Sequence, residues 1–224
     1  MRCVDKGTAP GIYTYYKAAR NDLGNRIGWI CSYCEMPVKN MIEVEHVHPI
    51  ANGGEELSWD NFLLSCRYCN GAKLNRNISR AGYLWTDTDN TMLAFEYSET
   101  NIVAPKAGLP EQITAMAQNT IDLMGLNRHP GLANEPTKAD TRWINRIEVL
   151  GIIEDSYKDW IKNRSAAFAR QIARTALGNG FYSFWIKKFE NEQMALDEIK
   201  SIFPHTYHPQ FNNGNLVVRH NGSF

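Results

Sequence analysis

The spacing of apolar and polar positions divides the chain into two regions of different character. In the first region, alternation over residues 41–46 and the apolar run 62–66 each predict a β-strand. The pattern after the second run suits a helix from Arg67 to about Asn77, and a further strand is expected over 92–97. A short helix is expected within 11–30, where glycines interrupt the pattern. The first region therefore combines short strands with short helices.

Beyond a link with several prolines and glycines, at about 98–110, the apolar positions recur close to every 3.6 residues, as amphipathic helices require. Helices are predicted over 110–124, 137–162, 165–177 and 181–203. The Asn212-Asn213-Gly214 segment suits the turn of a small hairpin. We therefore expect an α+β protein, with a first module over residues 1–100 and a mainly α-helical region over 110–224.

Composition narrows the class of protein. Hydrophobic residues make up 43% of the 224 residues, which argues against disorder. Lys plus Arg equals Asp plus Glu, at 24 each, so a nucleic-acid-binding surface would have to be local or supplied by a partner. No apolar run approaches the roughly 18 residues of a membrane span, and no targeting signal is apparent. A cytoplasmic protein without a membrane partner is the expectation.

Four of the five cysteines form two Cys-x-x-Cys pairs, Cys31 with Cys34 and Cys66 with Cys69. Each pair has the spacing of a knuckle that offers two thiolates to one tetrahedral ion, so the two pairs complete a closed structural zinc site. Four buried free cysteines, or a redox pair, are the alternatives, but the sequence around the pairs lacks a thioredoxin-like context. Cys3 has no partner and is interpreted as incidental.

Between the two cysteine pairs lies Glu45-His46-Val47-His48-Pro49, followed by Asn61 and by Asn70 directly after Cys69. This part of the chain resembles the HNH nuclease family. The resemblance runs from Cys31 to Lys73 and rests on the segments CSYC, VEHVHPIANGG and DNFLLSCRYCNGAK. It implies a ββα-metal fold, cross-linked by zinc through the flanking cysteine pairs, and a metal-dependent endonuclease.

The resemblance also assigns roles to single positions. Hydrolysis of a phosphodiester needs a base to activate water and a cation to offset negative charge. The neutral imidazole of His46 suits the base, and Glu45 and Asn70 take the positions of oxygen ligands for Mg²⁺ or Mn²⁺. Asn61 takes the position that fixes the loop and orients the histidine. The sequence has Leu74 where some family members carry a further histidine ligand, which favours a two-ligand site without catalytic zinc.

Two neighbouring residues are candidates for nucleic-acid contact. His48 shares a strand face with His46 and could be a second ligand, although a loop or substrate contact is favoured. Lys73 lies three residues after Asn70, on the same helix face, where it could contact a phosphate.

The segment YLWTDTDN, residues 83–90, is similar to the YLWPDxDN element of the PtuB-like subgroup of HNH nucleases, with Thr86 in place of the usual proline. That resemblance implies a nuclease of bacterial antiphage defence that is held by an ABC/SMC-like ATPase. The helical region would then dock on this partner, through aromatic anchors among Trp160, Phe181, Tyr182 and Trp185. A solvated helix face is expected for Arg142 and Arg146.

Three functions therefore remain open from the sequence. The first is an endonuclease acting on DNA, which is favoured. The second is an endoribonuclease that uses the same residues. The third is a non-catalytic zinc module that recognises nucleic acid or protein. The presence of Glu45, His46 and Asn70 together favours catalysis.

Overall fold

A hairpin and a short helix form the part of the chain that carries the candidate site. The computed structural model describes residues 1–98 and 102–224. Strand β1 (Glu43–His46) pairs antiparallel with β2 (Phe62–Ser65), so that His46 lies opposite Phe62, and α2 (Arg67–Lys73) follows. The predicted helix was too long, because Leu74 adopts a positive φ of 47° that ends α2.

Two further elements of this half differ in part from the pattern-based prediction. The expected early helix is a short 3-10 turn (Tyr16–Ala18) followed by α1 (Ala19–Ile27), which buries Leu23 and Ile27. The strand expected over 92–97 is a helical turn, α3 (Thr91–Ala94), and only then a strand, β3 (Phe95–Tyr97). β3 pairs with β4 (Val103–Pro105), which the sequence did not predict.

The second half of the chain is mainly helical, as its apolar periodicity predicts. The helices are α4 (Glu111–Met124), α5 (Arg142–Lys162), α6 (Ala166–Asn179), α7 (Tyr182–Lys188) and α8 (Gln193–Ile202). The single helix expected over 181–203 is thus two helices, separated at the buried Phe189. The predicted hairpin is formed by β5 (Phe211–Asn212) and β6 (Asn215–Leu216), with Asn213 and Gly214 at positive φ in its turn. Across the described ranges, no helix is both long and apolar enough to cross a membrane.

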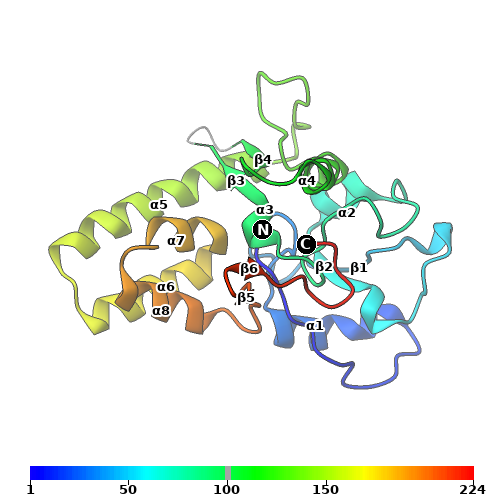
Figure 1. Cartoon of the computed structure of the whole chain (residues 1–224), viewed down its shortest axis with the longest axis horizontal. Coiled ribbons are helices and arrows are strands. Elements are labelled where there is room, and N and C mark those ends of the chain that lie inside the picture. Colours follow the sequence, from blue (N-terminus) through cyan, green and yellow to red (C-terminus); the bar gives the residue numbers. More distant parts are fainter. Residues whose placement is uncertain (99–101) are drawn as a thin grey trace.

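Buried apolar side chains gather in two clusters. The first joins the segments around β1, β2 and α1 to α4, and the second joins α5 to α8. Figure 1 shows the two groups at opposite ends of the molecule, with α5–α8 on the left and β1, β2, α1 and α2 on the right. α4 therefore packs with the first module, although the sequence grouped it with the region 110–224. The division into residues 1–100 and 110–224 remains a prediction.

Two sequence-based expectations for the helical region are wrong. The four proposed aromatic anchors all lie in the core, with exposed fractions between 0% and 3% for Trp160, Phe181, Tyr182 and Trp185. All four belong to the apolar core formed by α5–α8. Arg142 and Arg146 do not form a solvated face either, because they are only 2% and 3% exposed.

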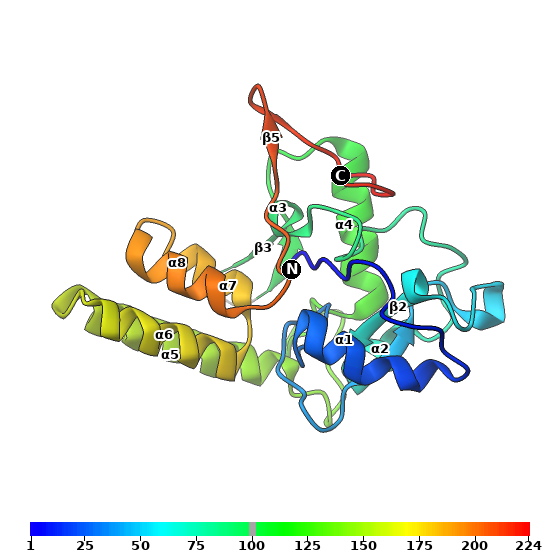
Figure 2. The same ribbon diagram turned by 90° about the horizontal axis from the view of Figure 1, so that it is seen from below.

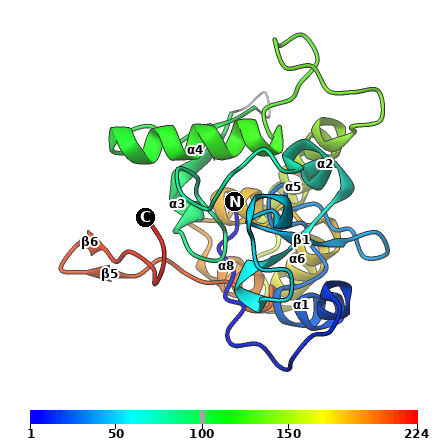
Figure 3. The same cartoon turned by 90° about the vertical axis from the view of Figure 1, so that its right-hand side faces the viewer.

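The segment after α8 returns to the first module. Arg219 donates hydrogen bonds to four backbone carbonyls, two on Thr86 and Asp89 at 3.0 Å and two on Val4 and Asp87 at 2.8 Å. The views in Figures 2 and 3 show this last segment passing the N-terminal segment, where Val4 bridges Thr206, before the β5–β6 hairpin projects from the body. The segment therefore connects the two ends of the described chain with the 83–90 element.

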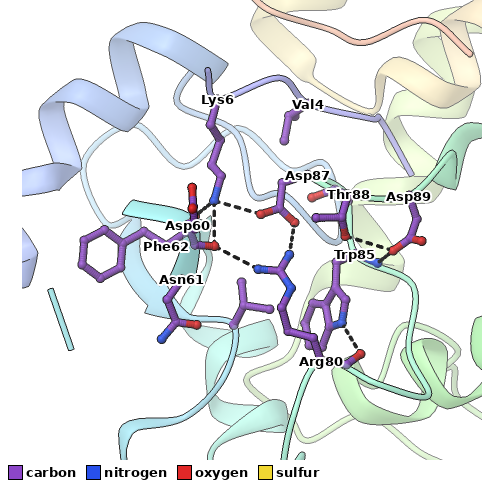
Figure 4. Close-up of polar contacts among 12 residues, drawn as sticks. Val4, Lys6, Asp60, Asn61, Phe62, Arg80, Trp85, Asp87, Thr88 and Asp89 are labelled. Atoms are coloured by element: carbon purple, nitrogen blue, oxygen red, sulfur yellow. Dashed lines mark hydrogen bonds and ion pairs between the residues drawn. The ribbon is translucent and has the colours of Figure 1, made fainter. Parts of the chain in front are cut away.

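A buried ion cluster explains part of the 83–90 element (Figure 4). The Asp87 carboxylate pairs with Lys6 at 2.8 Å and with Arg80 at 2.5 Å. The Lys6 ammonium also donates to the carbonyls of Trp59, Asp60 and Phe62, which precede and begin β2. Burial opposes ionisation of Asp87, but the charges of Lys6 and Arg80 outweigh it and lower its pKa. The cluster thus fixes the chain where it enters β2, opposite His46.

Candidate functional site

The four cysteines of the two pairs meet in one buried cluster. Their sulfur atoms all lie within 4.8 Å of one another, and each residue is at most 5% exposed. The first pair lies in a turn that ends at Glu35, which has a positive φ of 61°. The Glu35 amide donates a hydrogen bond to the Cys31 carbonyl. In the second pair, Cys66 precedes α2 and its sulfur accepts from the Cys69 amide. Cys3 lies outside this cluster and contacts Thr91 and Met92 instead.

This cluster fits a tetrahedral zinc ion. Zinc–sulfur bonds of about 2.3 Å require sulfur atoms about 3.8 Å apart, and those of Cys34 and Cys66 lie 3.7 Å apart. Without a cation the thiols compete for one charge. Burial opposes ionisation of Cys31, but hydrogen bonds from the other three thiols outweigh it and hold the pKa of Cys31 well below the usual value. The pKa of Cys34 is raised well above the usual value by its hydrogen bonds with Cys31, Cys66 and Cys69. A divalent cation removes this competition, and the donor set indicates a structural zinc site.

Arg142, at the start of α5, contacts the cysteine cluster directly. Its Nη1 atom lies 3.1 Å from the Cys69 sulfur, and its other nitrogens pair with both oxygens of Asp140. Burial alone would lower the pKa of Arg142, but the charge of Cys69 and the hydrogen bond with Asp140 outweigh it and raise that pKa. This contact brings a cation from the helical region to the thiolates.

The His46 imidazole occupies a slot between two aromatic rings. The Tyr16 ring lies 4.8 Å from it and the Phe62 ring 5.3 Å, measured between centroids. Its Nε2 lies 2.9 Å from the Glu56 carbonyl oxygen. A carbonyl can only accept, so Nε2 carries the hydrogen in the neutral ring, and Nδ1 retains the lone pair that a base needs. His46 is half-buried, which leaves it accessible to solvent.

The loop that supplies this carbonyl is held by Asn61. The Asn61 amide donates to the carbonyls of His48 and Glu55, both at 2.9 Å, and its oxygen accepts from the His48 amide at 2.8 Å. Both ends of the 48–56 loop are thereby tied to one side chain. Gly54 is required in this loop because a Cβ there would lie 2.0 Å from the His48 carbonyl oxygen. The His48 ring itself bonds the Asn52 carbonyl at 2.9 Å, inside the loop.

Glu45, the residue before His46, is held by side chains of the first module. One carboxylate oxygen pairs with the Lys73 ammonium at 3.0 Å, and the other accepts from the Tyr33 hydroxyl. Burial raises the pKa of Glu45, and the charge of Lys73 opposes that shift. Lys73 is 1% exposed and also donates to the His46 carbonyl at 2.6 Å. Its contacts are therefore internal, unlike the phosphate contact that the sequence predicts.

Asn70 lies beside a carboxylate that the sequence did not single out. Its Nδ2 donates to Glu43 at 2.6 Å, and its Oδ1 is the atom of this side chain that can ligate a cation. Glu43 and Glu45 share one face of β1, since alternate residues of a strand point the same way. His46, the last residue of β1, packs instead between Tyr16 and Phe62. The alternation could have identified Glu43, whereas no local pattern indicated Tyr16 or Tyr33.

The comparisons with known proteins agree with this part of the structure. Residues 31–76 match the family model described as HNH endonuclease. No curated protein matches the chain. The matched residues contain both cysteine pairs, β1, β2 and α2, and they support an HNH nuclease, a class that uses a divalent metal. The match does not reach α4 to α8.

We expect one zinc ion per chain, bound by the four clustered cysteines. Cys66→Ser should lose the metal and unfold the first module, because zinc binding contributes about 10 kcal/mol or more to such sites. Cys3→Ser is the matched control, since Cys3 is equally buried but outside the cluster. Elemental analysis and thermal unfolding measure both effects. Zinc-free wild-type protein, or a Cys66→Ser variant with full zinc content, would contradict the assignment.

Proposed function

We propose that the chain is a metal-dependent HNH endonuclease that hydrolyses phosphodiester bonds of nucleic acid. The observation that carries this proposal is the placement of the His46 imidazole. The ring lies between Tyr16 and Phe62, and its Nε2 is hydrogen-bonded to the Glu56 carbonyl. It lies within the residues that match the HNH endonuclease model. Among the described residues, the His46 Nδ1 makes no hydrogen bond, so at this partly exposed position it can accept a proton.

In this proposal His46 accepts a proton from water at Nδ1. The Glu56 carbonyl accepts a hydrogen bond from Nε2 and so favours the tautomer in which Nδ1 has the free lone pair. Asn61 holds the loop that carries this carbonyl. Tyr16 and Phe62 restrict rotation of the ring. The attacking water then loses its proton to Nδ1 as its oxygen bonds to phosphorus, and the bond to the leaving oxygen breaks. Orientation of the base is the contribution that these residues make.

Glu45 and Asn70 are proposed to hold the catalytic Mg²⁺ or Mn²⁺. A bound divalent ion would neutralise charge on the phosphate and the leaving oxygen. Both side chains offer oxygen, the donor that these hard cations prefer. Glu43 is the second candidate ligand, because it contacts Asn70 and is exposed, whereas Glu45 is paired with Lys73. For Glu45 to bind the ion, Lys73 would have to share or release its carboxylate.

DNA is the favoured substrate, with RNA as the alternative. The surface beside His46 offers groups that suit a nucleic-acid strand. Tyr15 is 53% exposed, and the Lys17 ammonium lies 5.9 Å from its ring centroid and 5.6 Å from that of Tyr16. An exposed cation and an exposed aromatic ring can contact a phosphate and a base. None of these groups reads the sugar.

A role in bacterial antiphage defence, with an ABC/SMC-like ATPase as partner, follows from the similarity of the 83–90 element to PtuB-like nucleases. The proposed docking surface is the helical region. Ile144 and Ile147 are 37% and 44% exposed, on the side of α5 that faces away from the buried Arg142 and Arg146. Exposed apolar side chains of this kind suit a protein interface.

We expect His46→Ala to lower cleavage by about 10²–10⁴-fold, because the base is lost. Purified protein would be incubated with plasmid DNA and with total RNA, in Mg²⁺, Mn²⁺ or chelator, and products resolved on gels. His129→Ala, in the helical half, is the control and should cleave normally. Zinc content and thermal unfolding should be unchanged in both variants. Cleavage by His46→Ala at the wild-type rate would remove His46 as the base and make His48 the candidate.

The metal ligands can be separated by titrating activity with Mn²⁺. We expect Glu45→Gln and Asn70→Ala to raise the half-saturating concentration more than about tenfold, equivalent to ~1.4 kcal/mol of binding. High Mn²⁺ should restore part of the activity. Glu43→Gln tests the second candidate ligand on the same strand face. A large effect of Glu43→Gln with none of Glu45→Gln would assign the ion to Glu43 and Asn70 instead.

The partner proposal is tested by affinity capture from the native host, followed by mass spectrometry. The full chain should recover an ATPase, and the Ile144→Glu/Ile147→Glu variant should lose it. Lys158→Glu, on an exposed part of the same helix, should recover the ATPase normally. Surface variants are preferable to removal of residues 110–224, because α4 belongs to the first apolar cluster. Recovery of the same ATPase by the double variant would exclude this surface.

A further inference from the structure

Two buried arginines of α5 lie beside the cysteine cluster. Arg142 and Arg146 are one helical turn apart, on the face of α5 that points into the protein. Arg142 makes the 3.1 Å contact to the Cys69 sulfur and also donates to the carbonyls of Met124 and Gly125. Arg146 is 3% exposed and follows one turn later on the same buried face. Arg142 therefore touches the metal site, and Arg146 is the next buried cation along the same helix face.

The two arginines differ in how their charge is balanced. Arg142 forms a buried ion pair with Asp140 at 2.7 Å. Within residues 1–98 and 102–224, no carboxylate pairs with Arg146, and its Nε is buried without a hydrogen-bond partner. A buried charge without a compensating partner is strongly destabilising. One helical turn earlier on the same face, Arg142 contacts the cysteine cluster, which is the potential anionic group on this side of α5.

The charge of a zinc-loaded cluster matches this requirement. Four thiolates and one Zn²⁺ carry a net charge of −2, whereas four neutral thiols carry none. Arg142 and Arg146 supply two positive charges, of which Asp140 offsets one. Metal-bound thiolates would therefore stabilise the buried cations on α5, and the cations would stabilise the thiolates.

A second contact joins the same two parts of the protein. The Glu35 carboxylate, next to Cys34, accepts from the Ser183 amide at 2.8 Å and from the Ser183 hydroxyl at 2.6 Å. The Phe181 amide donates to the Glu35 carbonyl at 2.9 Å. The first cysteine turn therefore touches the start of α7, while the cluster itself touches the start of α5.

We propose that Arg142 and Arg146 are charge-compensating partners of the zinc site, and that through them zinc binding holds the helical region on the first module. The arginines slow zinc loss, and zinc loss releases the N-terminal turns of α5. The inference rests on the zinc site and not on nuclease activity, so an inactive protein would leave it intact.

The first test is the rate and affinity of zinc release to a chromogenic chelator. Arg142→Met and Arg146→Met keep side-chain length without charge, and each should weaken zinc binding about 10–100-fold, as loss of a partner around the ligands does in other metal sites. Arg142→Lys and Arg146→Lys should retain more of the affinity. Arg174→Met, at an exposed position on α6, is the control and should match the wild type. Zinc affinity within twofold of the wild type in both methionine variants would overturn the proposal.

A second test uses only the wild-type chain, so it does not depend on whether a variant folds. Amide hydrogen exchange would be compared with and without chelator. Zinc removal should deprotect the amides of residues 145–148 at least tenfold, while α6 and α8 stay protected by the second apolar cluster. Unchanged protection of 145–148 after zinc is removed would show that α5 is held without the metal and would overturn the proposal.

Discussion

The cysteine cluster is the constraint on which the rest of this structure depends. Four sulfur atoms from two distant turns lie within 4.8 Å, and α2 begins at one of these turns. β1 and β2 are short, and a two-stranded hairpin has little stability of its own. Zinc bound by the four cysteines would stabilise this small sheet, because the free energy of binding at a structural metal site contributes to the free energy of folding. Arg142, buried at the start of α5, contacts Cys69 of this cluster and pairs with Asp140.

The proposed chemistry depends on this frame through backbone geometry. Asn61 ties the 48–56 loop, the loop carbonyl sets the His46 tautomer, and the Lys6–Asp87–Arg80 cluster fixes the entry to β2. Glu43 and Glu45 share one face of β1, and His46 is the last residue of this strand. The base and the oxygen donors are therefore different side chains held by the same short strand.

Much of the first module could be predicted from the sequence, since its signals are local. The cysteine spacing, the alternation over 41–46 and the order of Glu45, His46, Asn61 and Asn70 all lie within one short stretch. Contacts between distant segments could not be predicted. Arg142 is buried against Cys69, from a distant part of the chain, and Trp160 and Trp185 proved to be core residues because α5 to α8 pack on one another. The 92–97 strand was misplaced because α3 and β3 divide a segment too short to show either period.

Anomalous diffraction from crystals grown with Mn²⁺ is the most direct measurement of the central claim, a zinc-held module with a separate catalytic metal site. Data collected above and below the zinc edge distinguish the two elements. The account predicts zinc equidistant from the four cysteine sulfurs, at about 2.3 Å, and manganese at the oxygen donors of β1 and α2. Disulfides in place of the zinc, or manganese bound to the cysteines and absent from the β1–α2 face, would contradict it.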